Sequence, residues 1–315
     1  MEEIKTGPKL TSIIQSLVDN SNLFPERYLT FFSDIAPSDL NEVKKVWPKI
    51  PLGRKISLIE DMESMMIADT RLCFEEFVKF ALTDDFPEVR GSAIGLLWES
   101  ENPSFIRLLV NLLENDESEF VQIASAEALG RFVLLGELEE IPSSAFKRTI
   151  NALILKINSS PTKALHQELL KSLSYSSIPE VMPMIEAAFE NSDPTWQLAA
   201  IISMGRSADD HWKKTIIKMI ECDDNPQIRT EAVKAAGELE LASAQTLLLN
   251  ILDEQTDDPE LRLNLIWALS KIGGTAVKSA LEQLLEETGD DEETEALELA
   301  LEALGFSTGL PNIDL

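Results

Sequence analysis

The chain has 315 residues, of which 27 are basic and 55 acidic, for a formal net charge of −28. A surface of this sign repels a phosphate backbone, so binding to nucleic acid is not expected. Because 44% of the residues are hydrophobic, the chain has enough apolar material for a core and is not a disordered acidic polymer.

The N-terminal quarter predicts four helices separated by prolines: Lys9–Asn20, Glu26–Ile35, Ser38–Trp47 and Arg54–Ala68. These helices lack the repeated signal that begins at Asp85, so we expect residues 1–69 to form a helical cap that closes a repeat array. Basic residues gather around Trp47 in segment 44–55. The segment is either a docking site for a partner or a solvated turn that carries one packed tryptophan.

From Asp85 onward the chain repeats one helix-start signal, Asp or Asn, then Pro, and two residues later a bulky apolar residue. Asp85–Arg90, Asn225–Arg229 and Asp258–Arg262 show it clearly, and Asp193–Gln197 keeps its frame. The polar residue is suited to the N-cap, and proline is suited to the first helical position. The apolar residues are taken as markers, and they are Val89, Val121, Leu165, Trp196, Ile228 and Leu261, with a seventh unit at Ala296. A period of about 32 residues is typical of a stacked helical solenoid.

Small or apolar side chains occur four and eight residues after each marker, which places them on one helical stripe expected to be buried. The stripe comprises Ala93, Leu97, Ser125, Leu129, Leu169, Leu173, Ala200, Met204, Ala232, Ala236, Leu265, Leu269, Ala300 and Leu304. Glycines follow it at positions 130, 205, 237 and 305, where a left-handed residue would end each helix. Arg90, Arg229 and Arg262 follow their markers. They either bond a carboxylate or carbonyl at the adjacent turn or form an anion-binding row.

Apolar periodicity predicts the first helix of each pair at roughly 104–115, 145–158, 178–191, 210–222, 243–255 and 275–288. The step from Val121 to Leu165 spans 44 residues and contains an insertion at 134–144. This insertion is either a longer loop on one edge or a partner-binding element. Residues 306–315 form a short tail that contains Pro311.

The helix start, the buried stripe and the glycines together resemble the HEAT-repeat family. More narrowly, they are similar to the short bacterial repeats also found in phycobilin-lyase-like proteins. The resemblance covers about residues 70–305 and implies an all-α, right-handed α–α superhelix, an armadillo-like α-solenoid. The expected organisation is a cap at 1–69, a repeat array at 70–305 and a tail at 306–315. Such repeats serve many roles, so the resemblance does not name an activity.

Catalytic signals are sparse. His166 and His211 are the two histidines, and neither has a second histidine at helical ligand spacing. The iron hydroxylases of the HEAT family use paired His-Glu motifs, which have no match here. Its DNA glycosylases rely on a basic concave face, which this acidic chain lacks. Cys73 and Cys222 predict buried thiols, not a disulfide framework or a zinc site. We therefore expect no enzyme, no cofactor and no metal.

The chain shows no signal peptide and no stretch of 18 apolar residues, so a cytoplasmic protein without membrane attachment is expected. The expected partner is a protein or peptide. The acidity either steers a basic partner or only keeps a long exposed surface soluble. The sequence does not indicate an oligomeric state.

The resemblance places the second helix of each pair on the concave face, and residues two and six after the marker lie off the buried stripe. Most of these positions are polar or small, but five are large and apolar: Ile123, Leu198, Ile202, Leu263 and Trp267. Either neighbouring helices bury them, or Leu198, Ile202, Leu263 and Trp267 form a partly apolar binding site flanked by acidic residues. The favoured function is a non-enzymatic scaffold that binds a protein or peptide segment in the concave groove. The alternative is a phycobilin-lyase-like or chaperone-like protein that acts on a tetrapyrrole or a client protein.

Overall fold

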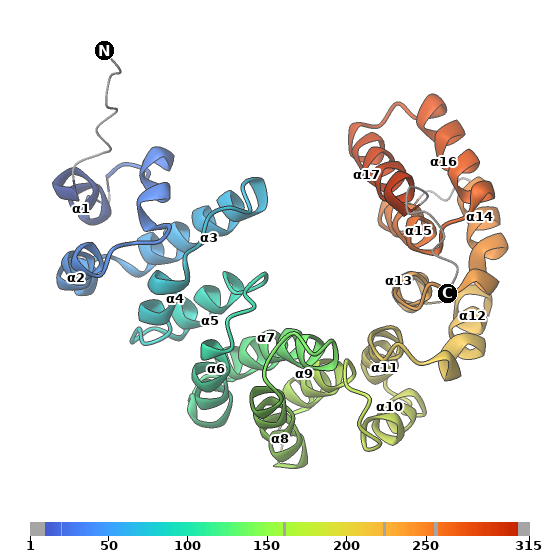
Figure 1. The fold of residues 1–315 in the computed structure, drawn as a ribbon, viewed down its shortest axis with the longest axis horizontal. Helices are drawn as coiled ribbons and strands as arrows, with labels where there is room; N and C mark the ends of the chain where they lie inside the picture. Colours follow the sequence, from blue (N-terminus) through green and yellow to red (C-terminus); the bar gives the residue numbers. More distant parts are fainter. Residues whose placement is uncertain (1–9, 20, 160–161, 223–224, 255–257, 308–315) are drawn as a thin grey trace. The chain divides into compact units, whose positions relative to one another are not determined.

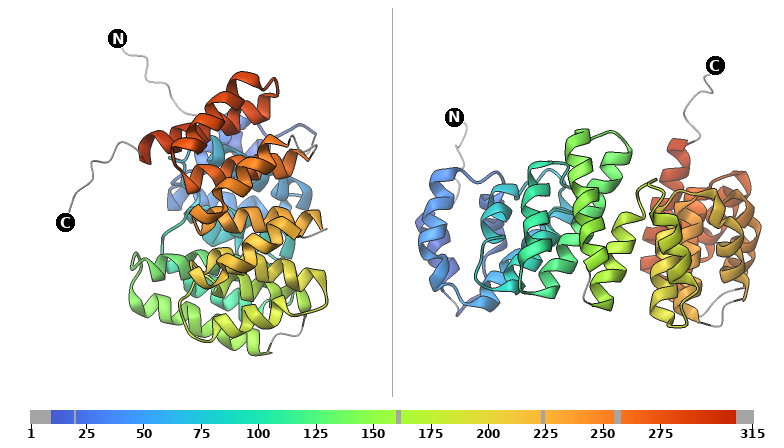
Figure 2. Two further views of the ribbon diagram at one scale, coloured as in Figure 1. Left: turned by 90° about the vertical axis from the view of Figure 1, so that its right-hand side faces the viewer. Right: turned by 90° about the horizontal axis from the view of Figure 1, so that it is seen from below.

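The computed structural model describes residues 10–19, 21–159, 162–222, 225–254 and 258–307, and within these ranges the regular structure is helical, with no strand (Figures 1 and 2). The predicted all-α fold is confirmed. The chain divides into two compact units, Met1–Ser172 and Leu173–Leu315, and the boundary lies near the end of one helix. The predicted cap, array and tail boundaries stay predictions.

Unit 1 begins with α1 (Leu10–Val18), the 3₁₀ helix η1 (Glu26–Phe32), α2 (Pro37–Val46), η2 (Trp47–Lys49) and α3 (Leu52–Ala68). It continues with α4 (Glu75–Ala81), α5 (Pro87–Gly95), α6 (Ser104–Asn115), α7 (Glu119–Glu137), α8 (Ser143–Ser159) and α9 (Lys163–Leu173). Three of the four helices predicted before residue 69 are confirmed as α-helices. The helix predicted at Glu26–Ile35 is instead a 3₁₀ helix over Glu26–Phe32, a form that proteins use in short segments.

The helices of unit 1 form two layers. The second helices α3, α5 and α7 pack in a row, and α4, α6 and α8 pack against them. Near the N-terminus an aromatic cluster fills the core: the ring of Phe77 makes edge-on contacts with Phe32 and with Trp47, at centroid distances of 5.4 and 5.6 Å. Such edge-to-face pairs add to the stabilisation that burial of the rings provides.

The basic segment 44–55 is divided between surface and core. Lys55 is 4% exposed and forms an ion pair of 2.7 Å with Asp84, which also accepts a hydrogen bond from the buried Trp47 Nε1. Arg54 is buried and donates to the Asp19 carbonyl at 2.9 Å. The solvated-turn interpretation is therefore wrong for Arg54 and Lys55, because both side chains are buried and donate to protein acceptors. It is right for Trp47, which is packed in the core. Lys44, Lys45 and Lys49 are exposed.

The insertion at 134–144 is not a long loop. Helix α7 continues to Glu137 and α8 already begins at Ser143, so the extra residues mainly lengthen two helices. The lengthened part is packed: the Phe146 ring lies directly against Gly136, and Leu135 and Ile141 are buried. The loop interpretation is wrong because apolar side chains give the extension its own helix–helix contact. A partner-binding role for it stays a prediction.

Unit 2 contains α10 (Val181–Phe189), α11 (Pro194–Arg206), η3 (Asp210–Trp212), α12 (Lys213–Cys222), α13 (Pro226–Glu238) and η4 (Ala242–Ala244). It ends with α14 (Gln245–Asp253), α15 (Pro259–Ile272), α16 (Thr275–Glu287) and α17 (Asp291–Ser307). The second helices α11, α13, α15 and α17 pack closely in one row, whereas the first helices contact one another much less (Figure 1). The closely packed row is therefore the inner layer of unit 2.

Counting from the markers identifies the buried stripe correctly, and all of its residues are buried. The glycine prediction is wrong. Gly130, Gly205, Gly237 and Gly305 lie inside their helices, and left-handed backbone occurs instead at Glu139, Ala208 and Glu240. Two of these glycines are needed for close approach between helices: a Cβ at Gly205 would be 2.9 Å from Ala235 Cα, and one at Gly237 would be 2.8 Å from Ala268 Cα.

The arginines after the markers hold adjacent turns together. Arg90 donates from Nε and Nη2 to the Asp116 carboxylate at 2.8 and 2.7 Å. Arg229 Nε donates to the Ile220 carbonyl at 3.1 Å, and Arg262 Nε to Glu293 at 2.5 Å. The prediction that these donors bond a carboxylate or carbonyl is confirmed.

Candidate protein-binding face

Three second helices of unit 2 begin in the same way, which puts their side chains in register. The side chains of Asp193, Asn225 and Asp258 accept a hydrogen bond from a backbone N–H of the first turn of α11, α13 and α15, respectively. An N-cap of this kind fixes where the helix begins and stabilises it by about 1 kcal/mol. Positions counted from the cap are therefore comparable between the three helices.

Residues two, six and ten after the markers form a pattern of three helices by three turns, which we call the inner face of unit 2. It comprises Leu198, Ile202 and Arg206 on α11; Thr230, Lys234 and Glu238 on α13; and Leu263, Trp267 and Lys271 on α15. Sequence analysis missed the charged residues at position ten. A further step of four residues along the same stripe would have found them.

The apolar residues predicted for the site differ in exposure. Trp267 is 38% exposed, so it is not packed inside the helical layers. Leu198, Ile202 and Leu263 are half-buried, and α13 lies between the helix that carries Leu198 and Ile202 and the helix that carries Trp267. Ile123 is also half-buried, but it belongs to α7 of unit 1. Four of the five predicted residues thus share the inner face of unit 2.

The Trp267 side chain is held in place by its neighbours although it is exposed. Its ring lies over Gly237 of α13, so closely that a Cβ added to Gly237 would be 2.7 Å from Trp267 Cζ3. Lys271, one turn further along α15, places Nζ 5.8 Å from the ring centroid. The glycine therefore creates the space that lets the indole lie across the junction of two helices with one side open to solvent.

Charges of both signs surround the apolar residues. Lys234 and Glu231 form an ion pair of 2.8 Å on α13, and Arg206 lies 5.0 Å from the ring centroid of Tyr175. Glu238 is an exposed residue, but its carboxylate lies against Gly205. Burial of this carboxylate raises the pKa of Glu238, nearby Glu231 also raises it, and Arg206 and Lys234 oppose the change.

An acidic edge follows on the next helix of the same layer. Glu298 and Glu302, at positions two and six of α17, are exposed, and so is Leu299, at 61%. Helix α17 carries six acidic residues and no basic residue. Acidic residues therefore flank the inner face on the α17 side, whereas the middle of the face is of mixed charge.

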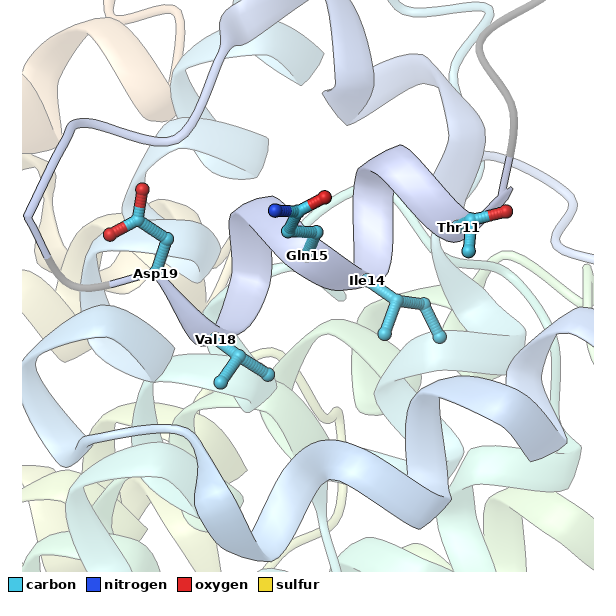
Figure 3. Close-up of a pocket in the computed structure, with 5 residues that line it drawn as sticks. All are labelled: Thr11, Ile14, Gln15, Val18 and Asp19. Atoms are coloured by element: carbon cyan, nitrogen blue, oxygen red, sulfur yellow. The ribbon is translucent and has the colours of Figure 1, made fainter.

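A shallow pocket of about 480 Å³ lies at α1 in unit 1, lined by Thr11, Ile14, Gln15, Val18 and Asp19. Figure 3 shows Ile14 and Val18 projecting from the same side of the helix. All of its lining residues come from α1 and the residue that follows it, so the pocket has no opposing wall that could position a ligand.

Side chains capable of chemistry are dispersed. The described parts of the chain contain no group of three or more His, Cys, Asp or Glu side chains that could hold a metal ion. Burial lowers the pKa of His166, and His211 Nε2 is 3.9 Å from Glu186 Oε1. Cys73 is half-buried, and burial raises the pKa of its thiol. The side chain of Cys222 lies outside the described residues.

No helix of the described ranges is both long and apolar enough to cross a membrane.

Stacked helix pairs with repeated caps, a buried small-residue stripe and one inner layer define an α-helical repeat protein. Comparison with protein families gives the same result: the profile described as HEAT repeats matches residues 74–143, 181–257 and 213–302, more than half of the chain. The chain belongs to the HEAT-repeat family. No curated protein matches it.

Several solved structures are similar over most of this chain at low sequence identity. Human deoxyhypusine hydroxylase in complex with glycerol is 17% identical, with 94% of this chain and 96% of that chain covered and a TM-score of 0.37. Escherichia coli YibA is 13% identical, with coverages of 97% and 99% and a TM-score of 0.40. Importin beta is 14% identical, with coverages of 93% and 46% and a TM-score of 0.44.

Proposed function

We propose that this protein is a non-enzymatic interaction scaffold that binds a protein or peptide segment along the inner face of unit 2. The observation that carries the proposal is Trp267, a large aromatic side chain that is exposed on a helix and held against Gly237. Tryptophan is enriched among residues that contribute most to binding at interfaces. A side chain that is already ordered loses little conformational entropy when a partner covers it.

The surroundings of Trp267 suit a segment that is both apolar and charged. Leu263 and Ile202 extend the apolar surface along α15 and α11, and Lys234, Glu238 and Lys271 supply charges of both signs. A bound segment would place an apolar side chain beside the indole and polar groups over α13. Basic residues of the segment would lie toward the acidic edge formed by Glu298 and Glu302 of α17.

The test compares two tryptophan variants. Partners are captured from the native host after crosslinking, with the wild-type chain, Trp267→Ala and Trp98→Ala as baits. Trp98 is 45% exposed and lies in unit 1, so it matches Trp267 in residue type and exposure. We expect Trp267→Ala to weaken binding of the captured partner by ~2 kcal/mol or more, as for an interface residue of this kind, and Trp98→Ala to leave it unchanged.

Equal capture by wild type and Trp267→Ala would contradict the proposed face. Circular dichroism of both variants checks that the helices are intact, so that a loss of binding is not a loss of fold. The tetrapyrrole alternative predicts that a bilin protects the chain from heat unfolding. No feature of the described residues favours this alternative, and it stays a prediction.

A further inference from the structure

A second surface, in unit 1 and in the layer of first helices, is basic on the side that α8 contributes. Between α6 and α8 lies an open groove of about 520 Å³, and the two helices are in contact along it. Val110 of α6 and Ala152 of α8 supply apolar surface, and Leu155 stands beside them with 68% of its surface exposed. Lys147 and Arg148 of α8 also line this α6–α8 groove, and so does the acidic Glu114 of α6, which leaves the lining with one net positive charge.

The charge of α8 is exceptional in this chain. The helix carries Lys147, Arg148 and Lys156 and no acidic residue, although the whole chain has a net charge of −28. Lys147 and Arg148 are exposed, and within the described ranges neither forms an ion pair, whereas exposed Lys45 pairs with Glu42 at 2.5 Å. Unpaired cations beside an exposed leucine form a surface with both an electrostatic and an apolar component.

We propose that the α6–α8 groove binds an acidic amphipathic helix of a partner protein. The furrow between two packed helices accepts the side-chain ridge of a third helix. Leucine-type residues of that helix would cover Leu155 and Val110, and its carboxylates would pair with Lys147 and Arg148. Nucleic acid fits less well, because the net charge of the chain repels it and phosphates make no use of Leu155. The inference is independent of the proposed function, since it concerns a different layer and a different unit.

The experiment measures binding of a fluorescent, helix-stapled peptide with leucines along one face and glutamates on the other. The 315-residue chain is titrated at low salt and fluorescence anisotropy is recorded. We expect Lys147→Glu/Arg148→Glu to weaken binding by about tenfold or more, because two favourable charge pairs become repulsive. We expect Leu155→Ser to weaken it by about fivefold or more through loss of apolar contact.

The matched control is Lys214→Glu/Lys218→Glu, which reverses two exposed lysines of α12 in the first-helix layer of unit 2. It should change the affinity by less than about twofold. The proposal is overturned if the wild-type chain does not bind the peptide, or if the control loses as much affinity as Lys147→Glu/Arg148→Glu. It is also overturned if a lysine version of the peptide binds equally well.

Two further outcomes would assign the α6–α8 groove to another occupant and so reject a partner helix. A duplex oligonucleotide that displaces the peptide and binds more tightly would indicate a nucleic-acid surface. Concentration-dependent self-association in analytical ultracentrifugation, abolished by Lys147→Glu/Arg148→Glu, would indicate a second copy of this chain. Helix α17, with six acidic residues and exposed Leu299, would then be the candidate occupant.

Discussion

Successive second helices are joined in different ways at two junctions of the molecule. Between α3 and the turn that leads into α5 in unit 1 the contact includes an ion pair, Lys55 with Asp84, and both residues are buried. Between α13 and α15 in unit 2 the contact depends on Gly237, whose missing side chain lets Ala268 and Trp267 approach. The repeat geometry is thus maintained by charge in one case and by small volume in the other. The two junctions should therefore fail under different perturbations.

The largest effect is expected from Lys55→Met. The substitution leaves the Asp84 carboxylate buried without its ion-pair partner, which typically destabilises a fold by about 3–5 kcal/mol. Urea unfolding measures the loss, and hydrogen exchange of peptides from α3 and α5 assigns it to unit 1. Lys45→Met, which removes an exposed pair with Glu42, is the control and should cost less than about 1 kcal/mol. Equal losses for the two variants would show that the buried pair has no special role.

A smaller effect is expected from Gly237→Ala. The new Cβ would lie 2.8 Å from Ala268 Cα, a backbone atom that cannot move aside, and overpacking of this kind costs about 1–3 kcal/mol. Gly305→Ala on α17 is the control, because nothing lies within 4 Å of its Cβ and alanine is the better helix former by up to ~1 kcal/mol. Differential scanning calorimetry should therefore show opposite shifts in melting temperature. A stabilised Gly237→Ala variant would contradict the close approach.

The third comparison concerns pH, which acts with opposite signs in the two units, and the smallest effect is expected at Glu238. Burial disfavours ionisation of Asp84, but Lys55, the Phe86 N–H and Trp47 together hold its pKa below the usual 3.8. A lowered folded-state pKa gives stability that is present above the unfolded-state value and is lost as the pH falls below about 4. The pKa of Glu238 is raised above 4.5, mainly by burial, so its ionised form weakens unit 2 at neutral pH and protonation relieves this.

The variants that test this difference are Asp84→Asn and Glu238→Gln. Asp84→Asn should destabilise unit 1 at pH 7. The free energy of unfolding of this variant should also fall less between pH 7 and pH 3 than that of the wild type. Glu238→Gln should stabilise unit 2 at pH 7 by less than about 1 kcal/mol, since solvent screens an exposed residue, and should make no difference at pH 3. Urea unfolding from pH 3 to pH 8, followed by hydrogen exchange in each unit, provides the comparison. A destabilised Glu238→Gln variant at pH 7 would contradict the sign.

The features that sequence analysis predicted correctly are encoded locally. Residues 85–90 contain a complete helix start, and the four-residue spacing that follows determines which side chains are buried, so the stripe could be assigned by counting. The partner of Lys55 could not be predicted in this way, because Asp84 lies 29 residues further along the chain. The prediction for Gly237 was wrong for the same reason. A glycine that follows the buried stripe is typical of a helix end, but Gly237 is needed for the contact with Ala268 of α15.

The candidate site shows the same limit. Counting from Leu261 singled out Trp267 as an apolar residue at a position that is usually polar, and its exposure agrees with that reasoning. Its orientation over Gly237 depends on packing between α13 and α15, which no local signal contains. Likewise, the basic charge of α8 is visible in the sequence, but its combination with Val110 of α6 requires the fold.

The extended pair α7 and α8 shows where one repeat of this chain can exceed the usual length without moving its caps. Relative to the 32-residue period, the extra residues lie at the end of α7 and the start of α8, while Asp116, at the end of α6, accepts hydrogen bonds from Arg90 and from the Ser118 N–H that precedes α7. A gene that gains or loses a few codons between Leu134 and Ser144 therefore alters one edge of one repeat and leaves the spacing of the caps on the opposite edge unchanged.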